Sequence, residues 1–279
     1  MDRPDVTTLG AVPETLLIPL AARMIAPERH PDLDFRDEEA ERIGTRIGFD
    51  PGRFADDTGS MRGSVVRAMW FDRVVSAFVG AHPNGLCVSI GSGLDDRPAR
   101  IGLPESVAWI DAEFAEVVRL REGVIASRAN VRNLVIDGLE PAAWIDKLPW
   151  DAGRPALVVA EGVTMYLAPA EGEALLRALV EAARARPASL EWAADFASPF
   201  MVRHSRRNPS LARTRASFAW ALRRPEDVTA IAPGLALIEE ADDISSRCGA
   251  LAWTMSHAHR LCTWRSIYFA ARYRLDAIH

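Results

Sequence analysis

Residues 87–97 read Cys-Val-Ser-Ile-Gly-Ser-Gly-Leu-Asp-Asp-Arg, and this stretch decides the fold. The apolar run 86–90 leads directly into Gly91-Ser92-Gly93, which predicts a buried strand entering a tight turn. Glycine in such a turn lets a ligand approach the backbone, because no Cβ stands in the way. Asp111 follows Gly91 by 20 residues, after a second apolar run at 106–110. An acid at this offset binds ribose hydroxyls in nucleotide-binding α/β folds.

The residue at one position of this loop restricts which class of ligand the loop can bind. A plain tight turn is the alternative for any Gly-x-Gly after a strand. The dinucleotide fingerprint requires Gly or Ala at its sixth position, so that helix and strand pack closely, but the chain has Asp96 there. A nicotinamide or flavin dinucleotide is therefore disfavoured. A ligand with a ribose but no pyrophosphate fits better, and S-adenosylmethionine is the candidate.

The loop also matches a family pattern, Gly-x-Gly-x-Asp-x-Arg, at Gly91, Gly93, Asp95 and Arg97. It resembles the glycine loop of class I S-adenosylmethionine-dependent methyltransferases, specifically the leucine carboxyl methyltransferase and tetracenomycin-type polyketide O-methyltransferase family. Four further stretches agree in order: Glu14-Thr15-Leu16-Leu17, Arg67 with Asp72, Trp109-Ile110-Asp111, and Glu161-Gly162-Val163 with Met165-Tyr166. The resemblance spans about residues 13–170, and the C-terminal third matches only in general layout.

Strand and helix patterns alternate after residue 85, which is typical of a doubly wound α/β sheet with parallel strands. The resemblance implies a Rossmann-like, seven-stranded class I methyltransferase sheet that ends in an antiparallel hairpin at its edge. Pro19 is expected to kink the first helix, and Pro27 with Pro31 to end it. We expect strands near 86–90, 106–110, 131–136, 155–160, 189–196, 235–239 and 265–273, and helices near 14–26, 37–47, 64–80, 112–127, 140–148, 169–186 and 243–258.

Length and composition are compatible with one large α/β domain, since the chain has 279 residues of which 49% are hydrophobic. We expect an N-terminal helical cap over residues 1–60 and a cofactor-binding methyltransferase domain over 61–279. Residues 197–229 interrupt the alternation and are rich in Arg, Ser and Pro, which indicates an inserted lid over the site. We name 197–229 the lid.

The net charge of −5 argues against a nucleic-acid partner. No apolar run reaches the length of a membrane span, and the N-terminus lacks the pattern of a signal peptide. The expected protein is therefore cytoplasmic, with a small-molecule partner and an oligomeric state that the sequence leaves open. The three cysteines, Cys87, Cys248 and Cys262, lack disulfide-framework or metal-ligand spacing, and no metal is expected.

The resemblance assigns cofactor-binding roles around the ends of the strands. Gly91 and Gly93 would face the methionine part of the cofactor, and Arg67 would hold its carboxylate; a solvated helix arginine is the alternative. Asp111 would accept the ribose hydroxyls, with a simple helix N-cap as the alternative. Asp137, beside Gly138, occupies the position of an acid near the adenine amino group. Glu140 is the other candidate for that acid.

A second group is expected near the reacting end of the cofactor. Glu161 ends an apolar run at 156–160, and a carboxylate there is an unlikely core residue because burying an unpaired charge is costly. The resemblance places Glu161 and Gly162 near the sulfonium. Tyr166 follows and is a candidate catalytic residue that would point at the transferred methyl group or the acceptor, with a packed aromatic as the alternative.

Methyl transfer from positive sulfur is an in-line displacement, so the site must mainly align three atoms. A carboxylate acceptor is already ionised at neutral pH, whereas a phenol with a pKa of about 10 benefits from a base. His204, His257 and His259 are candidate bases, each with a surface or packing role as the alternative; of these, His204 is the expected catalytic residue. Arg203, Arg206 and Arg207 of the lid would hold an acidic acceptor, unless they form a solvated charged face.

Together these features predict an S-adenosylmethionine-dependent O-methyltransferase of a small molecule such as a polyketide or other secondary metabolite, with a carboxylate favoured as acceptor. A protein C-terminal carboxyl methyltransferase and a non-catalytic S-adenosylmethionine-binding protein are the alternatives. A nicotinamide oxidoreductase is disfavoured by Asp96.

Overall fold

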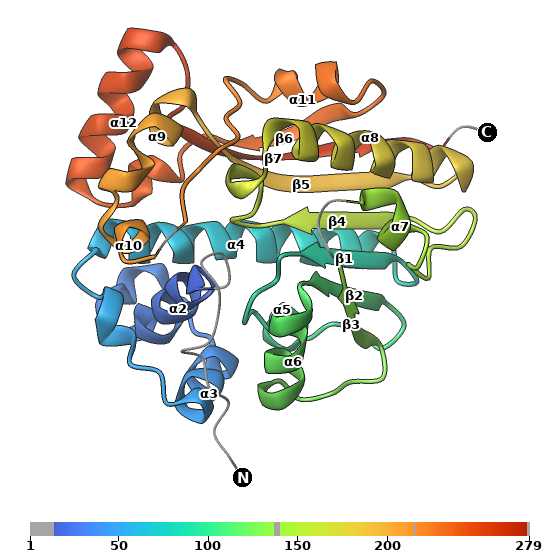
Figure 1. Ribbon diagram of the computed structural model, residues 1–279, viewed down its shortest axis with the longest axis horizontal. Coiled ribbons are helices and arrows are strands. Elements are labelled where there is room, and N and C mark those ends of the chain that lie inside the picture. Colours follow the sequence, from blue (N-terminus) through green and yellow to red (C-terminus); the bar gives the residue numbers. More distant parts are fainter. Residues whose placement is uncertain (1–13, 137–139, 215, 278–279) are drawn as a thin grey trace.

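The computed structural model of the chain describes residues 14–136, 140–214 and 216–277. Its centre is a seven-stranded sheet with the order β3-β2-β1-β4-β5-β7-β6 (Figure 1). Strand β7 is antiparallel to both of its neighbours, while β1 pairs in parallel with β2 and β4. The strands are β1 (Leu86–Ile90), β2 (Ala108–Glu113), β3 (Val131–Val135), β4 (Ala156–Ala160), β5 (Leu190–Ala197), β6 (Ala236–Ala241) and β7 (Tyr268–Leu275). This confirms the predicted fold class and its antiparallel edge.

Helices cover both faces of this sheet, because alternate residues of its buried strands belong to two separate apolar clusters. Leu157 and Val159 of β4 pack with α4 and the N-terminal helices, whereas Val158 and Ala160 pack with α7 and α8. The longer helices are α2 (Leu17–Arg29), α3 (Glu38–Ile47), α4 (Thr58–Ala81), α6 (Ala115–Val124), α8 (Pro169–Ala185) and α12 (Ala250–Thr263), and the short ones are α5 (Arg97–Arg100), α7 (Pro141–Ile145), α9 (Pro199–His204), α10 (Pro209–Ala212) and α11 (Glu226–Ile231).

Two predicted helices differ from the structure. Helix α2 begins at Leu17 and continues through Pro27 to Arg29, so Pro19 lies in its first turn, where a missing backbone N–H costs nothing. The predicted helix over 243–258 is instead a 3₁₀ turn at Ser245–Arg247 followed by α12. Gly249, with φ +115°, separates the two, because few other residues adopt that backbone conformation.

The predicted cap and the first part of the lid, with α9 and α10, lie near the carboxyl ends of the parallel strands, whereas α11 packs against α8 and β6 (Figure 1). The cap helices α2 and α3 share one apolar cluster with α4 and the sheet, and the lid contains the short helices α9, α10 and α11. The division into a cap and a main domain stays a prediction. Within the described ranges, no helix has the length and apolar character needed to cross a membrane.

Candidate cofactor and acceptor site

A cavity of about 1210 Å³ opens where β1, β2 and β4 end. The strand order reverses between β1 and β4, and ligands of open α/β sheets bind at such a switch point. The cavity is lined by the loops that follow these three strands, by α2 and α4, and by the segments at 200–211 and 244–255. The predicted site residues Arg67, Gly91, Gly93, Asp95, Arg97, Glu161, Gly162, Tyr166, His204 and Arg207 all line it.

The glycine loop has the tight geometry that the sequence predicts. Gly91 has φ +62°, a conformation that favours glycine, and a Cβ added there would lie 2.5 Å from Cγ2 of Val163. Gly162 has φ +68°, and a Cβ there would lie 2.9 Å from Nη2 of Arg67. The loop after β1 therefore approaches the loop after β4 closely because residue 91 is glycine, and the loop after β4 approaches the Arg67 side chain of α4 closely because residue 162 is glycine.

The structure places Asp111, the predicted ribose ligand, away from the cavity. Strand β2 extends to Glu113, so Asp111 lies inside the strand, 1% exposed and not among the residues that line the cavity. Its carboxylate accepts hydrogen bonds from Trp109 Nε1 at 2.9 Å and Arg121 Nη2 at 2.5 Å. Arg121 also donates to the carbonyl oxygens of Gly93 and Asp95, at 2.7 and 3.0 Å. Asp111 therefore supports the glycine loop through Arg121.

Glu113 takes the place predicted for Asp111. It is the last residue of β2, it lines the cavity, and it accepts the Gly93 N–H at 2.7 Å and the Phe114 N–H at 3.0 Å. A carboxylate has about four lone-pair positions, so two remain for ribose hydroxyls. Burial raises the pKa of Glu113, against the effect of its two backbone donors.

Phe114, Val117, Ile136 and Trp144 form an apolar part of the cavity lining, which we propose as the side that takes adenine. The predicted adenine ligands Asp137 and Gly138 lie outside the described residues. Their alternative, Glu140, is exposed and does not line the cavity. The assignment of Asp137 therefore stays a prediction.

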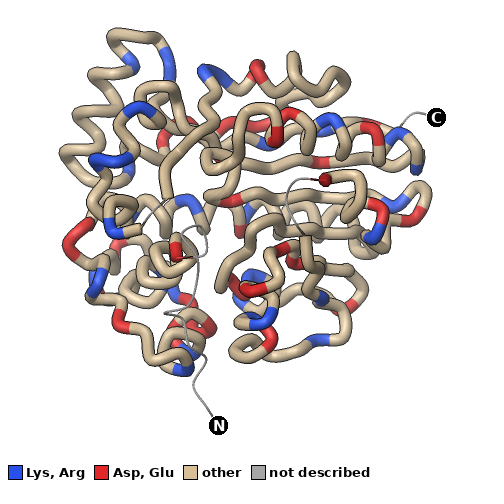
Figure 2. Tube along the Cα trace, in the orientation of Figure 1, with Lys and Arg blue, Asp and Glu red and all other residues tan. Residues whose placement is uncertain are grey.

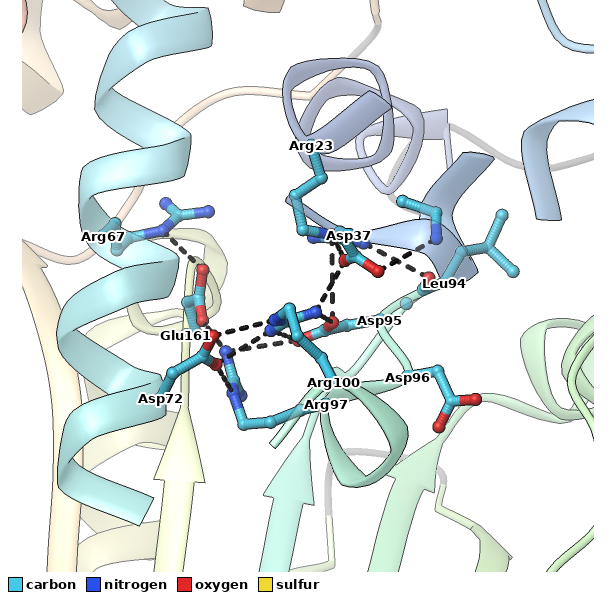
Figure 3. Close-up of polar contacts among 12 residues, drawn as sticks. Arg23, Asp37, Arg67, Asp72, Leu94, Asp95, Asp96, Arg97, Arg100 and Glu161 are labelled. Carbon is cyan, nitrogen blue, oxygen red and sulfur yellow. Dashed lines mark hydrogen bonds and ion pairs between the residues drawn. The ribbon is translucent and has the colours of Figure 1, made fainter. Parts of the chain in front are cut away.

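Buried ion pairs connect the loops, the cap and α4 beneath the cavity (Figure 3). We call this group the charge cluster; it consists of Arg23, Arg67, Arg97, Arg100, Asp37, Asp72, Asp95, Glu161 and Asp195. Arg97 Nε lies 2.7 Å from Asp72, and its Nη2 binds Glu161. Although burial opposes it, the pKa of Asp95 is held well below its ordinary value by Arg100, Arg23 and Arg97.

The charge cluster fits a ligand with net positive charge, because it has one more carboxylate than guanidinium groups. S-adenosylmethionine has that charge, from a sulfonium, an ammonium and one carboxylate. Arg67 reaches the cavity from α4, with Nε 3.1 Å from Glu161 and Nη1 3.3 Å from Asp195. Its proposed role toward the methionine carboxylate would use the guanidinium edge that these acids leave open.

Two tyrosines line the cavity near Gly162, and a buried aspartate lies behind them. Tyr166 lines the cavity with its ring edge-on to Phe218, centroids 5.2 Å apart, and burial raises its pKa to about 12. The sequence interpretation missed Asp195 and Tyr268. Asp195 is fully buried at the end of β5, accepts the Gly162 N–H at 2.7 Å and binds the Tyr268 hydroxyl. Asp195 lies in an apolar strand, the same signal that identified Glu161.

The lid supplies fewer cavity residues than predicted. Arg203, Arg206 and Arg207 are all exposed; of the three, Arg207 lines the cavity, whereas Arg203 and Arg206 do not. His204 lines the cavity and its Nδ1 lies 2.8 Å from the Phe200 carbonyl oxygen. His257 and His259 are outside the lining. The wall that the lid forms together with α12 is mainly apolar, with Phe200, Met201, Leu211 and Phe218 from the lid and Leu251 and Met255 from α12.

Across the ranges that the structure describes, no group of three or more His, Cys, Asp or Glu side chains is arranged to hold a metal ion.

Comparison with known proteins identifies the chain. The family model described as "Leucine carboxyl methyltransferase" matches residues 15–180. A tetracenomycin polyketide synthesis O-methyltransferase, TcmP of Streptomyces glaucescens, is 33% identical over 236 residues, which cover 85% of this chain and 84% of TcmP. An S-adenosyl-L-methionine-dependent methyltransferase of Gibberella zeae, dpfgK, is 28% identical over 286 residues, covering 96% and 94%.

Solved structures share the fold. A protein from Thermobifida fusca superposes with a TM-score of 0.55 at 14% identity, covering 93% of this chain and 94% of its own. A DUF574 family protein from Streptomyces avermitilis gives a TM-score of 0.51 at 17% identity, covering 91% and 97%. Together, the family model and the two relatives show that the chain is an S-adenosylmethionine-dependent methyltransferase. The chain belongs to the leucine carboxyl methyltransferase family.

Proposed function

We propose that this protein transfers the methyl group of S-adenosylmethionine to a carboxylate oxygen of a small, largely apolar molecule. The observation that carries the proposal is the polarity of the cavity. The wall opposite the cofactor loops is mainly apolar, with a few polar side chains such as Arg207 and Asn208, which suits a molecule that is mostly ring or hydrocarbon with one polar group. Its relative TcmP is named for polyketide synthesis and O-methylation, which is compatible with such an acceptor.

The acids in the lining support a carboxylate acceptor, because each already has a protein partner. Asp57 accepts from Ser60 and Ser210, Glu171 from the Ala168 N–H, and Asp56 pairs with Arg213. Glu113, Glu161 and Asp95 are engaged as described above. These hydrogen bonds and ion pairs occupy lone pairs that would otherwise be free to accept a proton from an acceptor. An ionised carboxylate needs no base.

Arg207 is the lid cation positioned to attract an acidic acceptor. It lines the cavity, and within the described ranges it forms no ion pair, unlike the guanidinium groups of the charge cluster. When bound, the cofactor supplies a methyl group on positive sulfur. The chain's own contribution is then to bind both molecules, exclude water with the apolar lid wall, and align the acceptor oxygen with that methyl group.

The test uses naphthoic acid as a probe of the apolar cavity, with S-adenosylmethionine whose methyl group is labelled. We expect a labelled product that releases methanol in alkali, as a methyl ester does. Absence of a labelled product from this acid and from larger aromatic acids would contradict the proposal. Naphthoic acid methyl ester serves as the control acceptor and should take up no label.

A further inference from the structure

One buried carboxylate beside the reacting end of the site has no part in the function proposed so far. Asp195 is 0% exposed, yet its side chain joins three elements. It accepts the Gly162 N–H from the loop after β4, Arg67 Nη1 from α4, and the Tyr268 hydroxyl from β7. Burying a carboxylate this completely is costly, and a merely structural link between these elements does not require a charge.

Tyr268 connects this carboxylate to the cavity. The tyrosine lines the cavity at the start of β7, and its hydroxyl donates to Oδ2 of Asp195. The same carboxylate holds Gly162, in the loop that we place near the sulfonium. Tyr268 therefore lies on the acceptor side of the reacting end, with a buried proton acceptor directly behind its hydroxyl.

We propose that Tyr268 and Asp195 form a proton relay that allows the site to methylate hydroxyl groups as a second class of acceptor. This inference rests on the proposed function, because it uses the same cofactor and cavity.

The acceptor hydroxyl gives its proton to Tyr268 Oη while Tyr268 gives its own proton to Asp195 Oδ2. The acceptor oxygen forms a bond to the methyl carbon, and the carbon–sulfur bond breaks with its electron pair going to sulfur. The sulfonium and the carboxylate thus both become neutral. After the ether leaves, Asp195 returns the proton to the cavity through Tyr268.

The surroundings of Asp195 favour this role. Burial raises the pKa of Asp195, against the effects of Arg67, Tyr268 and the Gly162 N–H, while the charge of Glu161 adds to the rise. Tyr166, a second tyrosine in the cavity lining, also lies near Asp195. A carboxylate with a raised pKa is a stronger base than an ordinary aspartate. Methylation of a hydroxyl is therefore expected to weaken at low pH, as Asp195 becomes protonated.

His204 is the other base near the acceptor, and the geometry separates it from the relay. It lies on the lid helix α9, where Nδ1 donates to the Phe200 carbonyl oxygen and its ring stacks on Phe200, with centroids 4.3 Å apart. It has no contact with Gly162, Arg67 or Asp195 among its described hydrogen bonds. The two candidates can therefore be distinguished by separate substitutions.

The experiment compares naphthol with naphthoic acid in wild-type protein and in Tyr268→Phe. The relay predicts that wild type makes methyl ether from naphthol, and that Tyr268→Phe lowers this rate by about 100-fold or more while changing the naphthoic acid rate by less than about 3-fold. Tyr273→Phe is the matched control, since Tyr273 is on the same strand but bonds the Pro225 carbonyl outside the cavity. His204→Gln should leave the ratio of the two rates unchanged.

Several outcomes would overturn the relay. The first is that wild type forms the ester and no ether, the second is that Tyr268→Phe lowers both rates equally, and the third is that His204→Gln abolishes the ether alone. Failure to form any ester contradicts the proposed function instead. Binding of S-adenosylhomocysteine checks that Tyr268→Phe is folded.

A pH profile of the wild type gives a second readout should that variant fail to fold. The ratio of ether to ester formation should rise with pH and level off well below the naphthol pKa of about 10. A ratio that rises tenfold per pH unit up to pH 9 would mean that free naphtholate reacts, which contradicts the relay.

Discussion

The two halves of the cavity are built differently. The cofactor half is held by the charge cluster, in which Arg97 and Asp95 are nearly enclosed by partners from α2, α4 and the strand loops. The lid half is formed by short helices and by α12, whose Leu251 and Trp264 are 76% and 88% exposed. The segments 199–213 and 247–265 each contain several basic residues and no Asp or Glu (Figure 2). The cofactor half is thus held together by buried ion pairs, whereas the lid half presents large apolar side chains to solvent.

Breaking the charge cluster should have the largest effect. Arg97→Ala leaves Asp72 and Glu161 as buried carboxylates without this partner, so we expect the free energy of unfolding to fall by about 3–5 kcal/mol. Denaturant unfolding measures the change. Arg177→Ala is the matched control, because its pair with Glu173 is exposed and contributes about 0.5 kcal/mol or less. Equal effects of the two substitutions would show that the cluster does not stabilise this half.

The assignment of the ribose ligand predicts a smaller effect on binding. Glu113→Gln should weaken S-adenosylhomocysteine about 10- to 100-fold, since charge-assisted hydrogen bonds contribute about 1.5–3 kcal/mol. Asp111→Asn should change this affinity by less than about 3-fold, because its carboxylate faces Arg121. It should instead lower stability. Calorimetric titration of both variants with S-adenosylhomocysteine distinguishes Glu113 from Asp111 as the ribose ligand. A greater loss of affinity in Asp111→Asn would support Asp111 instead.

A substitution in the lid should change the binding of the acceptor and leave the binding of the cofactor unchanged. Arg207→Ala is expected to raise the KM for naphthoic acid about 10-fold, which corresponds to one charge-assisted hydrogen bond. Arg203→Ala is the control, because its side chain is exposed outside the cavity and should leave KM unchanged. Initial-rate measurements at saturating S-adenosylmethionine test this pair. An equal rise in both variants would indicate a general surface field rather than contact.

The smallest expected effect is a change in stability from a substitution at the C-terminal end of α12. Trp264 adopts φ +57° at the helix C-cap while its side chain is 88% exposed. Trp264→Gly should therefore raise the free energy of unfolding by up to about 1 kcal/mol, since glycine adopts this conformation without strain. Thermal unfolding gives the result. A clear loss of stability would reveal packing of the indole that the structure does not show.

The sequence predicted local patterns well and long-range partners poorly. The apolar run 86–90 and its glycine turn match β1 and the loop after it, because both depend on neighbouring residues. Strand β2 was placed too early, since its apolar run stops at Ile110 while the strand continues through Asp111 to Glu113. The continuation depends on Arg121, which neutralises Asp111 from the following helix. Because the sequence does not show that Arg121 is its partner, Asp111 was predicted to follow the end of the strand.

The acceptor side was predicted less completely for the same reason. Tyr268 becomes part of the site only because β7 pairs with β5 and brings it to Asp195. Nothing near residue 268 in the sequence indicates that neighbour. The lid arginines form one cluster in sequence, yet the turn after α9 directs only Arg207 into the cavity lining.

The most direct test of the account is a titration of S-adenosylhomocysteine into wild-type protein and into the triple variant Arg203→Ala, Arg206→Ala, Arg207→Ala, with NADH titrated alongside. If the cofactor half is fixed independently of the lid, both proteins bind S-adenosylhomocysteine with the same Kd, to within about 3-fold, and neither binds NADH. A loss of affinity in the triple variant as large as its loss of acceptor binding would contradict the account.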